Sequence, residues 1–241
     1  DEETCFRGVN EICNELRKRN ITPRYTIVGE PTIFKICTCS KGDDEFVVEI
    51  LGKGCHSSCP GNGINANYIA AKLISYIEKL NKKIDGTTLS CGIMNGGNKG
   101  NIVPDQASVT FDVRSNSHKN LNKVKRLINQ KLQSLENEYE GSKISIRENF
   151  TLTPLEDIED VGLDKIIKKY NLEKGEFIGG CEAGYFQGLG GKAFLFGNGD
   201  LALAHKPNEY MIVEDYFKYN ELLLEIITEL DKLILGGNYG I

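Results

Sequence analysis

Two features are missing from this sequence: long apolar runs and an excess of basic residues. No stretch of its 241 residues approaches the roughly 18 consecutive apolar residues of a membrane-spanning helix, and its acidic start is unlike a secretion signal. Acidic side chains (34) outnumber basic ones (29), which gives a net charge of -5 without a basic stripe. These absences argue against a membrane protein and against a nucleic-acid-binding protein.

Cysteine is present, but the pattern of a small disulfide-rich secreted protein is not. The eight cysteines are scattered through a mid-sized, lysine-rich chain. We therefore expect reduced thiols and a cytoplasmic location. A composition that is 40% hydrophobic and 26% charged is typical of a globular protein with a sizeable core.

The middle of the chain has the pattern of a separate domain. Alternating and helical apolar periods predict, in order, a strand at 45–51, a helix at 64–80, strands at 87–94 and 107–114, a helix at 121–135 and a strand at 143–147. This βαββαβ order is the ferredoxin-like arrangement of one sheet with two helices.

The flanking regions have an α/β pattern. Predicted elements are a helix at 5–19, strands at 25–28 and 33–39, a helix at 164–170, a flexible loop at 179–184, a strand at 193–196 and a helix at 214–235. We predict that 1–41 and 151–241 form a catalytic domain with a mixed sheet flanked by helices. The ferredoxin-like region, 42–150, is inserted into it as a lid and dimerisation domain.

Several polar residues are candidates for a functional site, although each could also have an ordinary structural role. Glu2 and Glu3 are adjacent carboxylates, of which one could bind a cation while the other takes a proton from water. They equally suit an acidic helix start. Glu30 follows a predicted strand, and His56 and His205 lie in loops. Taken singly, such residues are more often surface or capping groups than ligands.

Together, these landmarks resemble one family: the dinuclear metal-dependent deacylases and peptidases that include acetylornithine deacetylase, succinyl-diaminopimelate desuccinylase and glutamate carboxypeptidase. The resemblance runs along nearly the whole chain, and the Glu-Ala loop leans toward acetylornithine deacetylase. The matching segments are Asp1-Glu2-Glu3-Thr4, Ile27-Val28-Gly29-Glu30-Pro31-Thr32, Gly52-Lys53-Gly54-Cys55-His56-Ser57-Ser58, Gly63-Ile64-Asn65-Ala66, Gly96-Gly97, Asn101-Ile102-Val103-Pro104-Asp105, Asp112-Val113-Arg114, Cys181-Glu182-Ala183 and Ala204-His205-Lys206-Pro207-Asn208-Glu209.

The resemblance implies a metal-assisted hydrolase of an N-acyl amino acid, most simply an N-acetylated one. Glu2 would be the general base that activates water. Glu3 and His205 would bind one metal ion and Glu30 the other. Carboxylate and imidazole ligands suit two zinc ions, with cobalt or manganese as alternatives.

The resemblance also assigns the remaining site residues. His56 would stabilise the oxyanion and would reach the site of a partner subunit in a homodimer. Arg114 would hold the substrate carboxylate, with Asn101 alongside. Gly180 and Asn198 would line the substrate pocket.

One part of the family pattern has no counterpart here. Members carry a His-x-Asp motif and a later metal-bridging Asp, whereas none of the three histidines of this chain lies in such a motif. We therefore expect the chain to be the carboxyl-terminal part of a longer enzyme that alone holds metal weakly and hydrolyses little.

Two other functions remain open. A dipeptidase or carboxypeptidase would use the same residues with a different pocket lining. A non-catalytic member would retain the catalytic half as a scaffold and use the insert for dimerisation.

Overall fold

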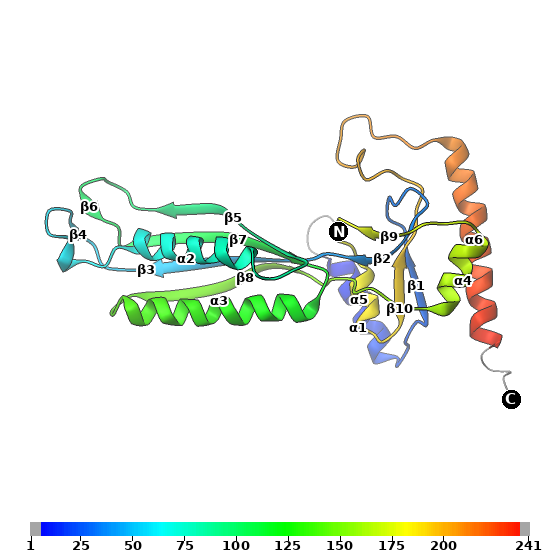
Figure 1. Ribbon diagram of the computed structural model, residues 1–241, viewed down its shortest axis with the longest axis horizontal. Helices are drawn as coiled ribbons and strands as arrows, with labels where there is room; N and C mark the ends of the chain where they lie inside the picture. The colour runs from blue at the N-terminus through cyan, green and yellow to red at the C-terminus, as the bar shows by residue number, and fades with distance from the viewer. Residues whose placement is uncertain (1–5, 237–241) are drawn as a thin grey trace. The chain divides into compact units, whose positions relative to one another are not determined.

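The computed structural model describes residues 6–236, and the chain divides into two compact units (Figure 1). One unit combines the chain up to Lys41 with the chain from Thr153 onward, and the other is Gly42–Leu152. We refer to them as the flanking unit and the insert. The catalytic and lid roles assigned to 1–41, 42–150 and 151–241 remain predictions.

The insert contains a four-stranded antiparallel sheet. Its main elements are β3 (Gly42–Leu51), α2 (Ala66–Asn81), β5 (Thr87–Gly96), β7 (Gln106–Ser115), α3 (His118–Glu138) and β8 (Lys143–Leu152). The strand order is β5-β7-β3-β8, and each neighbouring pair is antiparallel. This topology confirms the predicted ferredoxin-like βαββαβ arrangement.

The alternation of buried and less buried side chains along the strands of the insert explains why it has a single core. In β3 the side chains of Phe46, Val48 and Ile50 are buried, and the residues between them are less buried. Because successive side chains of a strand point to opposite faces, one face of β3 joins the core. The buried stripes of α2 and α3, which include Leu73 and Ile128, pack against that core. Asn65 caps α2 by accepting the Asn67 backbone N–H at 3.0 Å.

A second, smaller sheet in the insert was not predicted from the sequence. It pairs β4 (Cys55–His56) with β6 (Ile102–Val103), and a 3-10 helix, η1 (Pro60–Asn62), follows β4. Two-residue strands are too short to show an alternating pattern, so these segments read as turns. This sheet nonetheless positions two of the candidate site residues.

The flanking unit has a mixed sheet, as predicted. Its elements are α1 (Arg7–Lys18), β1 (Tyr25–Val28), β2 (Ile36–Ser40), α4 (Val161–Lys169), β9 (Lys174–Phe177), α5 (Ala183–Gln187), β10 (Lys192–Leu195) and α6 (Val213–Gly236). The order is β1-β10-β2-β9, with β1 parallel to β10, β10 antiparallel to β2, and β2 parallel to β9.

Both faces of the sheet in the flanking unit are buried, which accounts for the continuous apolar run of β10. Phe194 packs in a cluster with residues of α4 and α6. Ala193 and Leu195 pack on the other face with residues of α5. Figure 1 shows α4 and α6 on one side of the sheet and α1 and α5 on the other. A strand covered on both faces has apolar side chains at successive positions, which here are Ala193, Phe194 and Leu195.

The predicted loop at 179–184 is a loop as far as Glu182, but part of it is buried and a helix begins within it. Cys181 and Ala183 are fully buried, and Ala183 begins the short helix α5. The preceding strand β9 was also not predicted. Its sequence, Lys-Gly-Glu-Phe, has only one apolar residue, so tertiary pairing with β2 decides its conformation.

The two longest helices are α6, with 24 residues, and α3, with 21. Charged residues recur along both of them. Among the helices of residues 6–236, none combines the length and the apolar character required to cross a membrane.

Candidate functional site

Glu30 and Asn198 lie on two segments that run side by side in the flanking unit. Glu30 follows β1 and Asn198 follows β10, and these strands are parallel, so both residues lie at the same edge of the sheet. Ile33 N–H donates to the Gly199 carbonyl at 3.0 Å, and Thr32 forms a bridge with Asp200. The carboxyl edge of parallel strands is the usual location of binding groups in α/β proteins.

His205 lies further along the same connection after β10. It is exposed, lies in a turn and has a backbone φ of 59°, a left-handed conformation that non-glycine residues rarely adopt. Gly180 lies elsewhere in the flanking unit, between β9 and α5. The structure therefore brings Glu30 and Asn198 together and places His205 on the adjoining turn.

His56 and Asn101 come together in the small sheet of the insert. His56 pairs with Ile102, and Ser57 N–H donates to the Asn101 carbonyl at 3.0 Å. The His56 ring is exposed, and its Nδ1 lies 2.8 Å from Ser58 Oγ. With Nδ1 engaged by Ser58, Nε2 is the nitrogen presented to a ligand.

Arg114 does not lie beside Asn101 within the chain. Arg114 is near the carboxyl end of β7, whereas Asn101 precedes the amino end of that strand, which is about 30 Å long. The Arg114 guanidinium donates to both carboxylate oxygens of Asp112, at 3.1 and 3.2 Å, and Nη2 lies 2.9 Å from Asp43 Oδ2. A substrate carboxylate at Arg114 would have to compete with these two side chains.

Asp43 and Asp112 form a carboxyl pair beside Arg114. Burial is the largest factor that raises the pKa of Asp43 to about 7, and the hydrogen bond to Asp112 and that residue's charge add to it. The Arg114 guanidinium acts in the opposite direction. Since the Asp43 side chain is only 13% exposed, solvent does little to relieve this pairing.

The Asp43 carboxyl group is expected to make stability depend on pH. Folded chains retain its proton up to about pH 7, whereas unfolded chains release it near pH 4, so stability falls as pH rises through this window. Asp43→Asn keeps an uncharged group. We expect it to raise the free energy of unfolding relative to wild type by about 1 kcal/mol at pH 8, and this gain to vanish below about pH 4.

Urea unfolding at several pH values measures this difference. The exposed Asp85, changed to Asn, is the matched control and should follow the wild-type pH profile. A pH-independent difference between Asp43→Asn and wild type would contradict the assignment.

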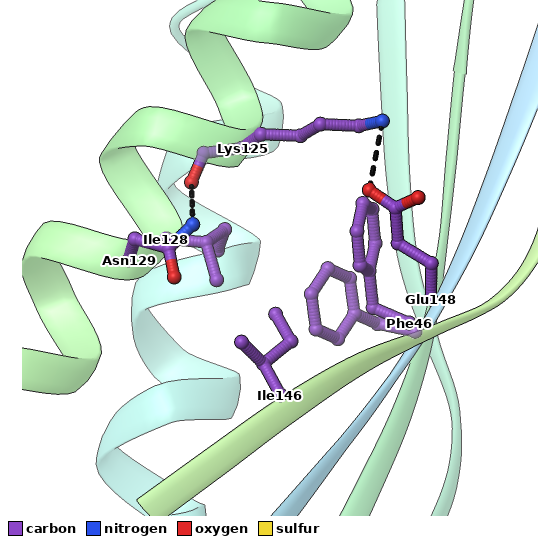
Figure 2. A pocket seen from close by; sticks show the side chains of 7 residues that line it. Phe46, Lys125, Ile128, Asn129, Ile146 and Glu148 are labelled. Atoms are coloured by element: carbon purple, nitrogen blue, oxygen red, sulfur yellow. Dashed lines mark hydrogen bonds and ion pairs between the residues drawn. The ribbon is translucent and has the colours of Figure 1, made fainter.

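A small recess lies between α3 and the sheet of the insert (Figure 2). It has a volume of about 140 Å³ and is lined by Phe46, Phe111, Lys125, Ile128, Asn129, Ile146 and Glu148. Figure 2 shows Lys125 reaching from α3 to Glu148 beside the ring of Phe46. Lys125 also pairs with the buried Asp44, 3.3 Å from Oδ2. This recess contains none of the predicted site residues.

The described residues do not by themselves fit the two zinc ions implied by the resemblance. Glu30 and His205 offer a carboxylate and an imidazole, which are donor types that zinc, cobalt and manganese accept. Within residues 6–236, however, no cluster of three or more His, Cys, Asp or Glu side chains is arranged to hold a metal ion. Glu2 and Glu3, the predicted base and third ligand, lie outside the described residues.

Three polar partners of the candidate residues were not predicted from the sequence. Asp43 and Asp112 flank Arg114, and Ser58 orients His56. The i, i+2 spacing of Asp112 and Arg114 on one strand places both on one face and could have indicated their pairing. The cross-strand partner Asp43 depends on the register of β3 with β7, which the sequence does not display.

Comparison with known sequences identifies relatives for nearly the whole chain. Residues 40–140 match a peptidase dimerisation domain of the M20 type. The chain is 31% identical to an uncharacterized metallohydrolase of Methanocaldococcus jannaschii, over 95% of this chain and 67% of the relative. It is 26% identical to an acetylornithine deacetylase of Myxococcus xanthus, over 95% of this chain and 62% of that protein.

Solved structures share the fold. The aminopeptidase PepT of Bacillus cereus superposes with a TM-score of 0.80 at 23% identity, covering 96% of this chain and 62% of that enzyme. The chain thus spans about two thirds of the length of these relatives. Given the identity to the Methanocaldococcus protein and the matching dimerisation domain, the chain belongs to the M20 family of metallohydrolases.

Proposed function

We propose that this protein is a metal-dependent amidohydrolase that removes the acetyl group from an N-acetylated amino acid. The observation that supports a site is the pairing of the Glu30 segment with the Asn198 segment at the carboxyl ends of β1 and β10. The acetylornithine deacetylases among the relatives support the substrate class.

We assign roles to the candidate residues as follows. Glu30, His205 and Glu3 would be the metal donors, and zinc is the metal that these groups would favour. Glu2 takes the proton of the attacking water and returns it to the leaving amine. His56, through Nε2, donates a hydrogen bond to the developing oxyanion. Bound metal ions in such hydrolases polarise the carbonyl and lower the pKa of water.

The substrate-binding residues divide between the two units. Gly180 and Asn198 belong to the flanking unit, whereas Asn101 and Arg114 belong to the insert. Asn101 lies with His56, so the two act together. Arg114 binds the substrate carboxylate in competition with two side chains, because Asp112 occupies the Nε–Nη2 edge of the guanidinium and Asp43 also contacts Nη2.

We also propose that the protein is a homodimer in the cytoplasm. The match of 40–140 to a peptidase dimerisation domain supports the dimer. The seven cysteines that the structure describes are all free thiols, which agrees with a reducing compartment.

Comparing two substrates tests the proposed activity. The natural full-length protein, loaded with zinc, is given N-acetylornithine and an unmodified dipeptide, and its metal content is measured in parallel. We expect kcat/KM for N-acetylornithine to be at least about tenfold higher, which corresponds to a difference of about 1.4 kcal/mol between the two transition states.

Each other outcome selects a different function. A higher kcat/KM for the dipeptide would identify a peptidase and would contradict the proposed preference for acetylated substrates. No hydrolysis of either substrate by protein with a full metal complement would favour a non-catalytic dimerising scaffold.

A further inference from the structure

The loop that carries His56 contains two thiols, one on each side of the histidine. Cys55 lies in β4, and Cys59 directly precedes η1, four residues later. Cys59 is exposed and Cys55 is partly buried. The pair therefore combines a thiol open to solvent with a more protected one in the same short loop.

The loop geometry brings the two cysteines close together. Cys59 N–H donates to the His56 carbonyl at 3.0 Å, which folds 56–59 into a turn. The Cys55 thiol donates to the Cys59 carbonyl oxygen at 3.4 Å. Because C=O and Cα–C bonds together measure about 2.8 Å, the Cys55 sulfur lies within about 6 Å of the Cys59 Cα. Rotation about χ1 of Cys59, the Cα–Cβ bond, changes the position of the Cys59 sulfur relative to the Cys55 sulfur.

Backbone hydrogen bonds hold both ends of the loop, because the Cys59 carbonyl also accepts the Asn62 N–H at 3.1 Å. Cys55 is paired with Val103 in the small sheet. The Cys59 side chain contacts the Ser58 hydroxyl, with Sγ 3.7 Å from Oγ. Closing the remaining gap between the sulfurs therefore requires the Cys59 side chain to leave the Ser58 hydroxyl and the 57–59 turn to shift.

We propose that Cys55 and Cys59 are a redox-active pair that forms a reversible disulfide when a hydroperoxide reaches the loop. The exposed Cys59 attacks the peroxide O–O bond, which yields a sulfenic acid and releases water or an alcohol. Cys55 then attacks that sulfur, forms the S–S bond and releases a second water. The two thiols together lose two protons and two electrons, and the peroxide accepts them.

The surroundings of the other cysteines favour this pair. Cys13, Cys37 and Cys181 are buried. Burial raises the pKa of the thiols of Cys13 and Cys37, and it raises the pKa of the partly buried Cys39 to about 11. Thiols that ionise less react more slowly with peroxide.

The disulfide would change the environment of His56. Ser58 lies next to Cys59 and makes two contacts with the imidazole: Oγ is 2.8 Å from Nδ1, and the backbone N–H donates to Nδ1 at 3.2 Å. Moving Cys59 displaces Ser58 and so reorients the ring. An effect on catalysis rests on the proposed function of His56, whereas formation of the bridge does not.

Peptide mapping tests the bridge in the full chain. The protein is treated with hydrogen peroxide, and the remaining thiols are alkylated with iodoacetamide before digestion and mass spectrometry. We expect the peptide with Cys55 and Cys59 to lose two hydrogens and take up no alkyl group, and dithiothreitol to restore two alkylatable thiols. Cys55→Ser and Cys59→Ser should each abolish the bridge, and the control Cys91→Ser should retain it.

A second readout follows His56 directly. Oxidation should shift the His56 ring signals in NMR spectra of the wild type and leave those of Cys59→Ser in place. Recovery of Cys55 and Cys59 as alkylated thiols or sulfinic acids, or bridged to a third cysteine, would overturn the proposal. Neither readout needs turnover, so a protein without deacetylase activity can still show the bridge.

Discussion

Gly197→Ala is expected to lower the free energy of unfolding by about 3 kcal/mol and to displace the Glu30 segment. A Cβ atom at this buried position would lie 2.1 Å from the Glu30 carbonyl oxygen and 3.0 Å from its carbonyl carbon. Both of these are backbone atoms, so no side-chain rotation relieves the overlap. Residue 197 must therefore be glycine for the β1 and β10 connections to approach this closely.

Hydrogen bonds on both sides of Gly197 prevent the two segments from separating. Gly197 N–H donates to Thr32 Oγ1 at 2.9 Å, and Phe34 N–H donates to the Gly197 carbonyl at 2.8 Å. Phe196 N–H donates to the Val28 carbonyl at 3.0 Å. Relief of the overlap has to break some of these buried bonds, and each buried group left unpaired costs roughly 1–3 kcal/mol.

Thermal and urea unfolding measure the loss of stability, and activity in the full-length protein reports the displacement of Glu30. Gly29→Ala is the matched control, because a Cβ there approaches only the Tyr219 hydroxyl, at 3.9 Å. The control should remain near wild type in both measurements. If Gly197→Ala were as stable as Gly29→Ala, the close approach of the two segments would be wrong.

Lys125→Met is expected to destabilise the insert by about 2–3 kcal/mol at neutral pH. Lys125 is the cation 3.3 Å from Asp44 Oδ2, and the Asp44 side chain is only 2% exposed. Burial raises the pKa of Asp44, and the Lys125 charge opposes that rise. Methionine keeps the aliphatic contact with Phe46 but leaves a buried carboxylate without its cation. The partial exposure of Lys125 keeps the effect below that of a fully buried pair.

The pH dependence of this loss provides a further check. Without Lys125 the folded-state pKa of Asp44 rises further above its unfolded value, so the penalty is present at neutral pH and fades as pH falls toward about 4. Adding Asp44→Asn should recover most of the lost stability at neutral pH. The exposed Lys123 of the same helix, changed to Met, should have little effect. Equal losses in Lys125→Met and Lys123→Met would refute the role of the buried pair.

Much of the fold could be predicted from the sequence because its strongest periods are local. The apolar stripe of α3 and the alternation in β3 each specify which face is buried, and the order of these elements specifies the ferredoxin-like topology. Elements without a clear local period were not predicted. Neither β9 nor the two-residue strands β4 and β6 contain enough residues to establish a period.

The candidate site, too, could be predicted from the sequence only in part. Glu30 at the end of β1 was recognisable from its place after an apolar strand and before proline. Its proximity to Asn198 depends on the parallel pairing of β1 with β10, which are separated by more than 160 residues of sequence. The carboxyl pair at Arg114 likewise depends on the register of β3 with β7.

Local periodicity and residue type were enough to predict the longer helices, the long strands, the ferredoxin-like insert and the candidate site residues. Which of those side chains come into contact depends on the tertiary fold. Glu30 meets the Asn198 segment through Gly197, Arg114 is held by Asp43 and Asp112, and Cys55 folds back on Cys59. Such contacts depend on strand register and backbone approach, which are set by packing between segments distant in sequence or by turn geometry rather than by a local pattern.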